Sequence, residues 1–174
     1  MTTTDLAFIQ QSRVYLRDDF APRISLCLDT INDEDIWWRP NEASNSIGNL
    51  VLHLAGNARQ WIVSGVGQQP YTRARQEEFD RREPMPRQEL LSLLKATLTE
   101  VDGVLGALRV EQLLEPRLIQ GYDTTVLGAV YHVVEHFAMH TGQIILLTKA
   151  RTGRDLGFYR VKDGIAKPTW LEPS

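Results

Sequence analysis

Apolar residues recur every three or four positions along four long stretches of the chain. This spacing places them on one face of an α-helix, whereas a half-buried strand would need strict alternation. We therefore expect helices over residues 5–31, 46–65, 86–108 and 124–151. Alternation of useful length is absent from the sequence, so no strand is predicted. Four long amphipathic helices joined by loops predict an all-α fold, a four-helix bundle.

Local signals mark several helix boundaries. Pro22 lies inside the first stretch and predicts a kink or a break there. Ser46 is a favoured N-cap residue for the second helix. The fourth helix has Asp123 or Thr124 as its cap and Gly153 as its stop.

The segments between and after the helices differ in character. Residues 68–86 are polar, contain prolines and balanced charges, and predict a long solvated loop that would allow a crossover connection. A second connector contains Pro116. We expect residues 1–152 to form the bundle and residues 153–174 to form a C-terminal tail. Three aromatic side chains predict that the tail packs on the bundle: Phe158, Tyr159 and Trp170.

Composition narrows the class of protein. The 174 residues are 43% hydrophobic and 24% charged, which suits a single globular domain. The net charge of −3 and the lack of a basic run argue against a nucleic-acid partner. No window approaches the roughly 18 consecutive apolar residues of a membrane span. The single cysteine, Cys27, excludes an internal disulfide and predicts a buried core residue in a reducing compartment. We expect a cytoplasmic protein, since the N-terminus lacks a secretion pattern.

The four histidines carry the chemical signal. His132, His136 and His140 fall within nine residues, at spacings of four, in the segment VYHVVEHFAMHTGQI. On a helix they form a slanting row, with neighbours about 6 Å apart along the axis. Two such imidazoles can bind one divalent metal, but a row of about 12 Å is too long for all three to share it. A third ligand would come from His53, within an apolar run of the second helix. The pattern leaves open a metal site or hydrogen-bonded core histidines.

Other catalytic motifs are missing from the sequence. Glu135 directly precedes His136, so neither an HExxH motif nor a repeated carboxylate–histidine pair of a di-iron bundle is formed. There is no CxxC, GxSxG or phosphate-binding loop. Nucleophilic catalysis by serine or cysteine therefore has no local support.

Two segments together resemble a known superfamily. SIGNLVLHLAGNARQWI, followed far downstream by HVVEHFAMHTGQI, resembles the DinB-like superfamily, which includes YfiT-like proteins and bacillithiol- and mycothiol-dependent enzymes. Trp38 and Pro40 match the connector before the second helix, and Gly142 and Gln143 complete the final motif. The resemblance covers about residues 8–150 and is nearest to a bacterial branch of DinB-like proteins.

The resemblance implies a fold, a metal site and a class of reaction. The fold is a four-helix bundle of the DinB/YfiT type, with one divalent metal held by His53, His136 and His140. Zinc and nickel both suit three imidazoles, and such a site keeps positions open for water or substrate. The implied function is a metal-dependent enzyme of the thiol S-transferase or hydrolase type, with a small-molecule thiol or electrophile as partner. The resemblance also implies a homodimer.

Two other functions remain open at this point. One is a non-catalytic bundle that binds a metal or a small molecule. The other is a structural bundle that dimerises through an exposed helix face. A metal-dependent enzyme needs both an ion and a turnover, whereas the binding bundle needs only the ion and the structural bundle needs neither.

Residues beside the histidine ligands are secondary candidates. His132 would be catalytic, as a proton shuttle or substrate contact, or else a structural histidine. Asn57, four residues after His53, and Gln143, three after His140, would orient ligands through hydrogen bonds, or else be ordinary packing amides. Glu135 would point about 100° away from the row, which disfavours it as a base.

Overall fold

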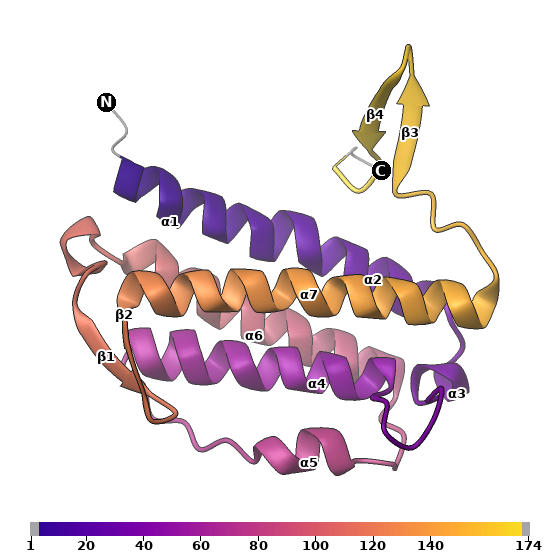
Figure 1. The fold of residues 1–174 in the computed structure, drawn as a ribbon, viewed down its shortest axis with the longest axis horizontal. Coiled ribbons are helices and arrows are strands. Elements are labelled where there is room, and N and C mark those ends of the chain that lie inside the picture. Colours follow the sequence, from indigo (N-terminus) through magenta and orange to yellow (C-terminus); the bar gives the residue numbers. More distant parts are fainter. Residues whose placement is uncertain (1–3, 172–174) are drawn as a thin grey trace.

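The computed structural model describes residues 4–171, so the two ends of the predicted domain and tail, residues 1–3 and 172–174, lie outside the described residues. Four long helical segments dominate the chain (Figure 1). The first joins α1, a π-helical turn and α2, and the second joins α4 to another π-helical stretch. Their bounds are α1 Thr4–Val14, η1 Tyr15–Phe20, α2 Ala21–Thr30, α4 Ile47–Ala58, η2 Arg59–Val66, α6 Arg87–Ala107 and α7 Val126–Thr152.

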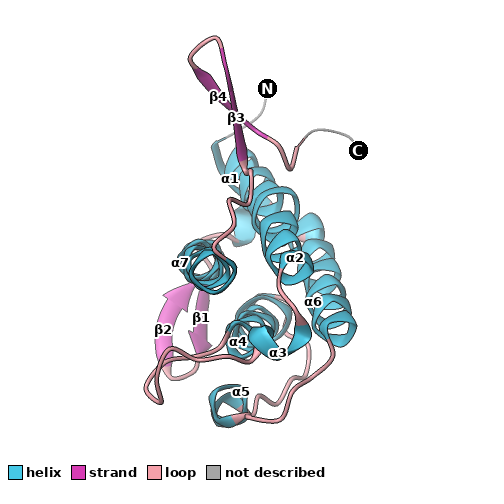
Figure 2. Cartoon of the chain, turned by 90° about the vertical axis from the view of Figure 1, so that its right-hand side faces the viewer, coloured by secondary structure: helices cyan, strands magenta, loops and turns pink. Residues whose placement is uncertain are grey.

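The four segments pack side by side, which confirms the predicted all-α four-helix bundle (Figure 2). Helix α7 contacts both α2 and α4, and α6 contacts the same two helices from the other side. The connection from η2 to α6 runs back along the bundle, so α4 and α6 point in the same direction (Figure 1). The crossover that the loop length allowed is therefore present, and it places α4 directly beside α7.

Most predicted helix boundaries agree with the structure. Ser46 caps α4 in a reciprocal hydrogen-bonded box with Asn49. Gly153 ends α7 with a φ of 65°, a left-handed conformation that glycine adopts without strain. The cap of α7 is Thr125, one residue beyond the predicted choices. Asp123 and Thr124 are held in a short strand instead.

Pro22 produces a widened helical turn and not a break. The first segment continues through η1, where the Ala21 N–H donates to the carbonyl of Leu16, five residues earlier. Pro22 follows in the first turn of α2, where a missing N–H costs least. The chain therefore passes residue 20 as one continuous helix.

Two small β-hairpins contradict the expectation that the chain has no strands. Strand β1 Pro116–Ile119 pairs with β2 Tyr122–Thr125, and β3 Tyr159–Lys162 pairs with β4 Ile165–Pro168. Each strand has only four residues, too few to show a clear alternation. Both turns need positive φ at two positions, supplied by Gln120–Gly121 and Asp163–Gly164.

Three short helices complete the chain: α3 Asp33–Ile36, α5 Arg75–Asp80 and the 3₁₀ turn η3 Val110–Gln112. Helix α5 lies in the segment that was predicted to be a solvated loop. It packs along the outer side of α4 (Figure 1). Asn49 of α4 donates to the Glu78 carbonyl at 2.7 Å, and the centre of the Phe79 ring lies 4.5 Å from that of the His53 ring, although none of the α5 residues is fully buried.

The C-terminal tail contacts the bundle at its base, while its hairpin projects outward (Figures 1 and 2). Leu156 is buried and Phe158 packs against the core. The Arg23 guanidinium lies 4.9 Å from the centre of the Trp170 ring. Both faces of β3 are exposed, Tyr159 included. The boundary between bundle and tail at residue 152 remains a prediction, and α7 ends at that residue.

Cys27 is fully buried in the core, as predicted. Burial raises the pKa of its thiol to about 11, so the thiolate needed for nucleophilic attack is scarce at neutral pH. Within residues 4–171, none of the helices combines the length and apolar character needed to cross a membrane.

Candidate metal centre

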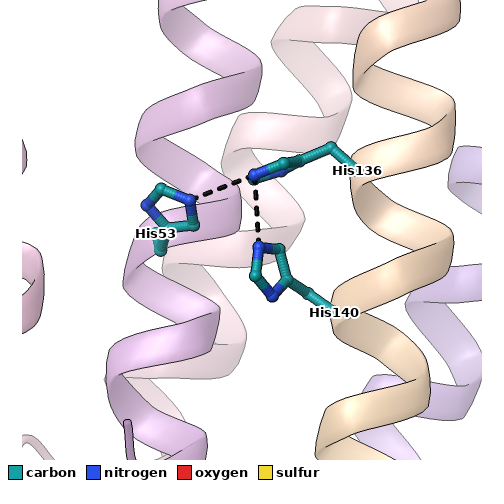
Figure 3. Close-up of side chains that lie close together, drawn as sticks. All are labelled: His53, His136 and His140. Carbon is teal, nitrogen blue, oxygen red and sulfur yellow. Dashed lines mark hydrogen bonds between the residues drawn. The ribbon is translucent and has the colours of Figure 1, made fainter. Parts of the chain in front are cut away.

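Helices α4 and α7 bring the three predicted ligand histidines together (Figure 3). The Nε2 atom of His136 lies 3.1 Å from Nε2 of His53 and 3.2 Å from Nε2 of His140. One ring nitrogen from each residue lies within 4.8 Å of the others. All three side chains are buried, with exposed fractions between 5% and 9%. We call these residues the histidine trio.

Two members of the trio, His136 and His140, have pKa values below that of a free imidazole. Burial, followed by the nearby His140 and His53, lowers the pKa of His136 to about 3. Burial also lowers the pKa of His140, even though its hydrogen bond with Gln143 acts in the opposite direction. Neutral imidazoles keep a lone pair on one ring nitrogen, which is the form that binds metals.

The donor set fits a divalent ion. In a tetrahedral zinc site with metal–nitrogen bonds of 2.0–2.1 Å, ligand nitrogens lie about 3.4 Å apart. The two short nitrogen–nitrogen distances of 3.1 and 3.2 Å are close to that value. Among the described residues, Nδ1 of His136 is buried without a hydrogen-bond partner, so the polar contacts of this ring are those of Nε2 with the other two histidines. The trio can therefore hold one ion, and its donor atoms suit zinc and nickel alike.

Arg73 and Glu78 support His53 from outside the bundle. Glu78 Oε2 lies 3.0 Å from His53 Nδ1. Arg73 pairs with both carboxylate oxygens of Glu78 at 2.6 Å, from Nε to Oε1 and from Nη2 to Oε2. Burial acts to raise the pKa of Glu78, but the contacts with His53 and Arg73 outweigh it, so the pKa lies below its ordinary value. Glu78 is thus an ionised hydrogen-bond acceptor.

Gly56 makes room for this pair. It lies one turn after His53, on the side of α4 that faces Glu78. A Cβ atom at Gly56 would lie 2.0 Å from Glu78 Oε1 and 2.9 Å from Arg73 Nε. The bare backbone therefore allows the carboxylate to reach the ring of His53.

Gln143 supports His140 as the sequence suggested. Its Oε1 atom lies 2.6 Å from Nδ1 of His140. An amide oxygen only accepts, so the His140 proton lies on Nδ1 and the lone pair lies on Nε2. A neutral ring held in this way points its free nitrogen toward the other two histidines (Figure 3).

His132 lies beside the trio but does not join it. Its Nε2 atom faces Nδ2 of Asn57 at 3.2 Å, and its ring packs against Trp61 at a tilt of 40°, with centroids 4.1 Å apart. The rings of His132 and His136 have centroids 5.3 Å apart. Burial lowers the pKa of His132. Asn57 thus contacts His132 and not one of the trio. Glu135 is exposed, in line with the expectation that it points away from the row.

Sequence reasoning missed Arg73 and Glu78. Both lie in the segment 68–86, whose mixed charges suggested a solvated loop. Nothing in their local pattern separates them from the other charged residues around them. The one signal within reach was Gly56, a glycine in the interior of a helix, which often marks close approach of another group.

Comparison with known proteins identifies the family. Residues 7–163 match the family described as "Protein of unknown function (DUF1572)". The chain belongs to this DinB-like family. The predicted membership of the DinB-like superfamily is thereby confirmed. No curated protein matches the sequence.

Solved structures share the fold of this DUF1572 protein. A DinB-like protein (YjoA) from Bacillus subtilis is 19% identical, with a TM-score of 0.63 over 83% of this chain and 93% of its own. A conserved protein from Enterococcus faecalis is 17% identical, with a TM-score of 0.68 over 83% and 97%. A DinB-like protein from Bacillus cereus is 17% identical, with a TM-score of 0.65 over 90% and 97%. At these identities the likeness establishes the fold.

Proposed function

We propose that this protein is a metal-dependent enzyme whose histidine trio holds one zinc or nickel ion. The observation that carries the proposal is the convergence of His53, His136 and His140 within 4.8 Å in a buried part of the bundle. Three imidazole ligands leave further coordination positions open, the arrangement used by catalytic metal sites. Each neutral imidazole has one N–H donor, and that of His140 already goes to Gln143, so the three Nε2 atoms that face one another are short of hydrogens.

We assign the reaction to the thiol S-transferase or hydrolase type. A divalent ion bound there would lower the pKa of a thiol or water that it coordinates. The protein's own residues bind that ion, exclude bulk water from it and hold the ligand rings in place. The substrates proposed are a small-molecule thiol and an electrophile, in line with the motifs shared with thiol-dependent DinB-like enzymes.

His132 is proposed as the catalytic residue beside the ion. It lies one helical turn before His136 on α7, and its ring is held between Asn57 and Trp61. Because Nε2 faces the Asn57 amide, its proton lies on Nδ1. From this position the side chain would contact a substrate or pass a proton.

A non-catalytic metal-binding role is the alternative. The trio joins α4 to α7, so a bound ion would cross-link two bundle helices and contribute to folding. In that case the protein would turn over no substrate, and removal of the ion would change only its stability.

A paired assay separates the two functions. Zinc- or nickel-loaded wild type and His136→Ala would be mixed with a low-molecular-weight thiol and an aromatic chloro-electrophile, and separately with an activated ester. Product formed by the wild type alone would support the enzyme. A metal-dependent rise in melting temperature without any product would favour the binding bundle.

We also propose a cytoplasmic homodimer. In the single chain, helix α7 exposes three large apolar side chains: Tyr131, Met139 and Leu146. An unpartnered apolar face of this kind is typical of an interface. Sedimentation equilibrium of the purified protein should give twice the mass of the chain, and a mass equal to that of one chain would contradict the dimer.

A further inference from the structure

The segment between α4 and α6 contributes a buried ion pair to the candidate site. We propose that Arg73 and Glu78 are positioning residues that fix the His53 proton on Nδ1 and so aim the Nε2 lone pair at the metal position. The inference rests on the proposed metal site, because the direction of this lone pair matters where an ion binds. Arg73 precedes α5 and Glu78 lies within it, so both come from outside the four bundle helices.

The pair is buried and lies in a network of hydrogen bonds. The side chain of Arg73 is 2% exposed and that of Glu78 is 12% exposed. Two parallel N–H donors of Arg73 reach the two oxygens of Glu78. A third donor, Nη1, reaches Oε1 of Gln60 at 3.0 Å. A buried ion pair is destabilising unless its remaining hydrogens are satisfied, and here four of the five N–H groups of Arg73 have acceptors, the fourth being the His53 carbonyl.

Counting donors and acceptors places the His53 proton. Nδ1 of His53 lies 3.0 Å from Glu78 Oε2 and 3.0 Å from Arg73 Nη2. A carboxylate only accepts and a guanidinium only donates. The two hydrogens of Nη2 already have acceptors, Glu78 Oε2 at 2.6 Å and the His53 carbonyl at 3.3 Å. An accepting Nδ1 would instead set its lone pair 3.0 Å from the ionised Oε2 of Glu78, a contact between two acceptors. We therefore assign the proton to Nδ1, donating to Glu78, which leaves the lone pair on Nε2.

Arg73 has a second effect on the same proton. Its two N–H groups occupy both oxygens of Glu78, so the carboxylate stays an acceptor toward His53. A glutamine at position 78 would offer only one oxygen. Arg73 would take that oxygen, and the glutamine NH₂ group would face Nδ1 as a donor. The His53 proton would then move to Nε2 and point at the other two histidines.

A purely structural role would be to tether α5 to α4. Helix α5 buries none of its residues, and Asn49 already holds it by donating to the Glu78 carbonyl at 2.7 Å. A tether would not depend on which ring nitrogen of His53 carries the proton. The tautomer of His53 therefore distinguishes positioning from tethering.

The first test reads this tautomer without any metal. Two-dimensional ¹H–¹⁵N NMR of the histidine rings would be recorded for metal-free wild type, Glu78→Gln and the control Glu77→Gln, an exposed neighbour on α5. We expect the proton on Nδ1 in wild type and control, and on Nε2 in Glu78→Gln. A wild-type proton on Nε2, or no change in Glu78→Gln, would overturn the proposal. The wild-type spectrum alone is decisive if the variant does not fold.

The second test measures zinc affinity by competition with a chromophoric chelator. Loss of a hydrogen-bond partner behind a metal-binding histidine typically weakens metal affinity 10–100-fold. We expect that loss in Glu78→Gln and none in Glu77→Gln, with circular dichroism confirming that both fold. Equal affinity in all three proteins would refute positioning. If wild type binds neither zinc nor nickel, the proposed function fails, while the NMR result still decides the placement of the proton.

Discussion

Gly56→Ala is the substitution that most sharply probes how close Glu78 lies to α4. The added Cβ would lie 2.0 Å from Glu78 Oε1, whereas real Cβ contacts essentially never fall below 3.0 Å. The carboxylate must therefore retreat by about 1 Å. A retreat of that size would lengthen its 3.0 Å contact with His53 Nδ1 beyond hydrogen-bond range.

The expected energy follows from two opposing effects. Loss of a hydrogen bond to a charged group costs about 1.5–3 kcal/mol. Alanine in a helix interior is better than glycine by about 1 kcal/mol. The net result should be a loss of about 0.5–2 kcal/mol in the free energy of unfolding of the metal-free protein. Gly103→Ala on α6 is the matched control, because nothing lies within 4 Å of its added Cβ. That variant should gain about 1 kcal/mol.

Urea denaturation followed by circular dichroism would compare the two alanine variants with wild type. Zinc affinity would be measured in parallel, and we expect it to fall about tenfold or more in Gly56→Ala and to stay unchanged in Gly103→Ala. The reasoning is refuted if Gly56→Ala is stabilised as much as Gly103→Ala and binds zinc as tightly as wild type.

Three further predictions concern pH, metal and chemistry. Acidification should destabilise the metal-free protein, because burial lowers the pKa of His136 to about 3 from an ordinary 6.5, so the unfolded chain binds more protons below pH 6.5. At pH 5 the free energy of unfolding should be roughly 2 kcal/mol lower than above pH 6.5. Urea midpoints measured across this range test it, and a free energy of unfolding that does not change with pH would contradict it. Zinc at about 100 times its Kd should stabilise wild type by about 2.7 kcal/mol in thermal unfolding, with no gain in His140→Ala. His132→Gln should keep its metal yet lose turnover about 100-fold or more in the thiol-transfer assay, and full activity would exclude His132 from the chemistry.

The helical frame was open to prediction because it depends on local rules. The spacing of apolar residues marks the four long helices. Ser46 caps the start of α4 and Gly153 ends α7, and both effects depend only on the adjacent turn of backbone. His136 and His140 share a face because they are four residues apart on one helix. Their meeting with His53 depends on the side-by-side packing of α4 and α7, which a helical pattern alone does not specify.

The supporting contacts were beyond sequence reasoning for a physical reason. Glu78 reaches His53 across 25 residues and through the gap that Gly56 leaves on α4. Its neighbours carry the same kinds of charge, so no local property marks it. The hairpins were missed because four-residue strands carry little periodicity, although Asp163–Gly164 is a recognised turn pair that could have indicated one.

The central claim is that three histidines on α4 and α7 hold one ion. Its most direct test is elemental analysis of untagged protein purified without added metal, for wild type, His53→Ala, His136→Ala, His140→Ala and the control His132→Ala. We predict about one equivalent of zinc or nickel in wild type and in His132→Ala, and its loss in the other three variants. Wild type that holds no metal above background, even after incubation with zinc or nickel, would contradict the account and leave the trio as packing residues of the core.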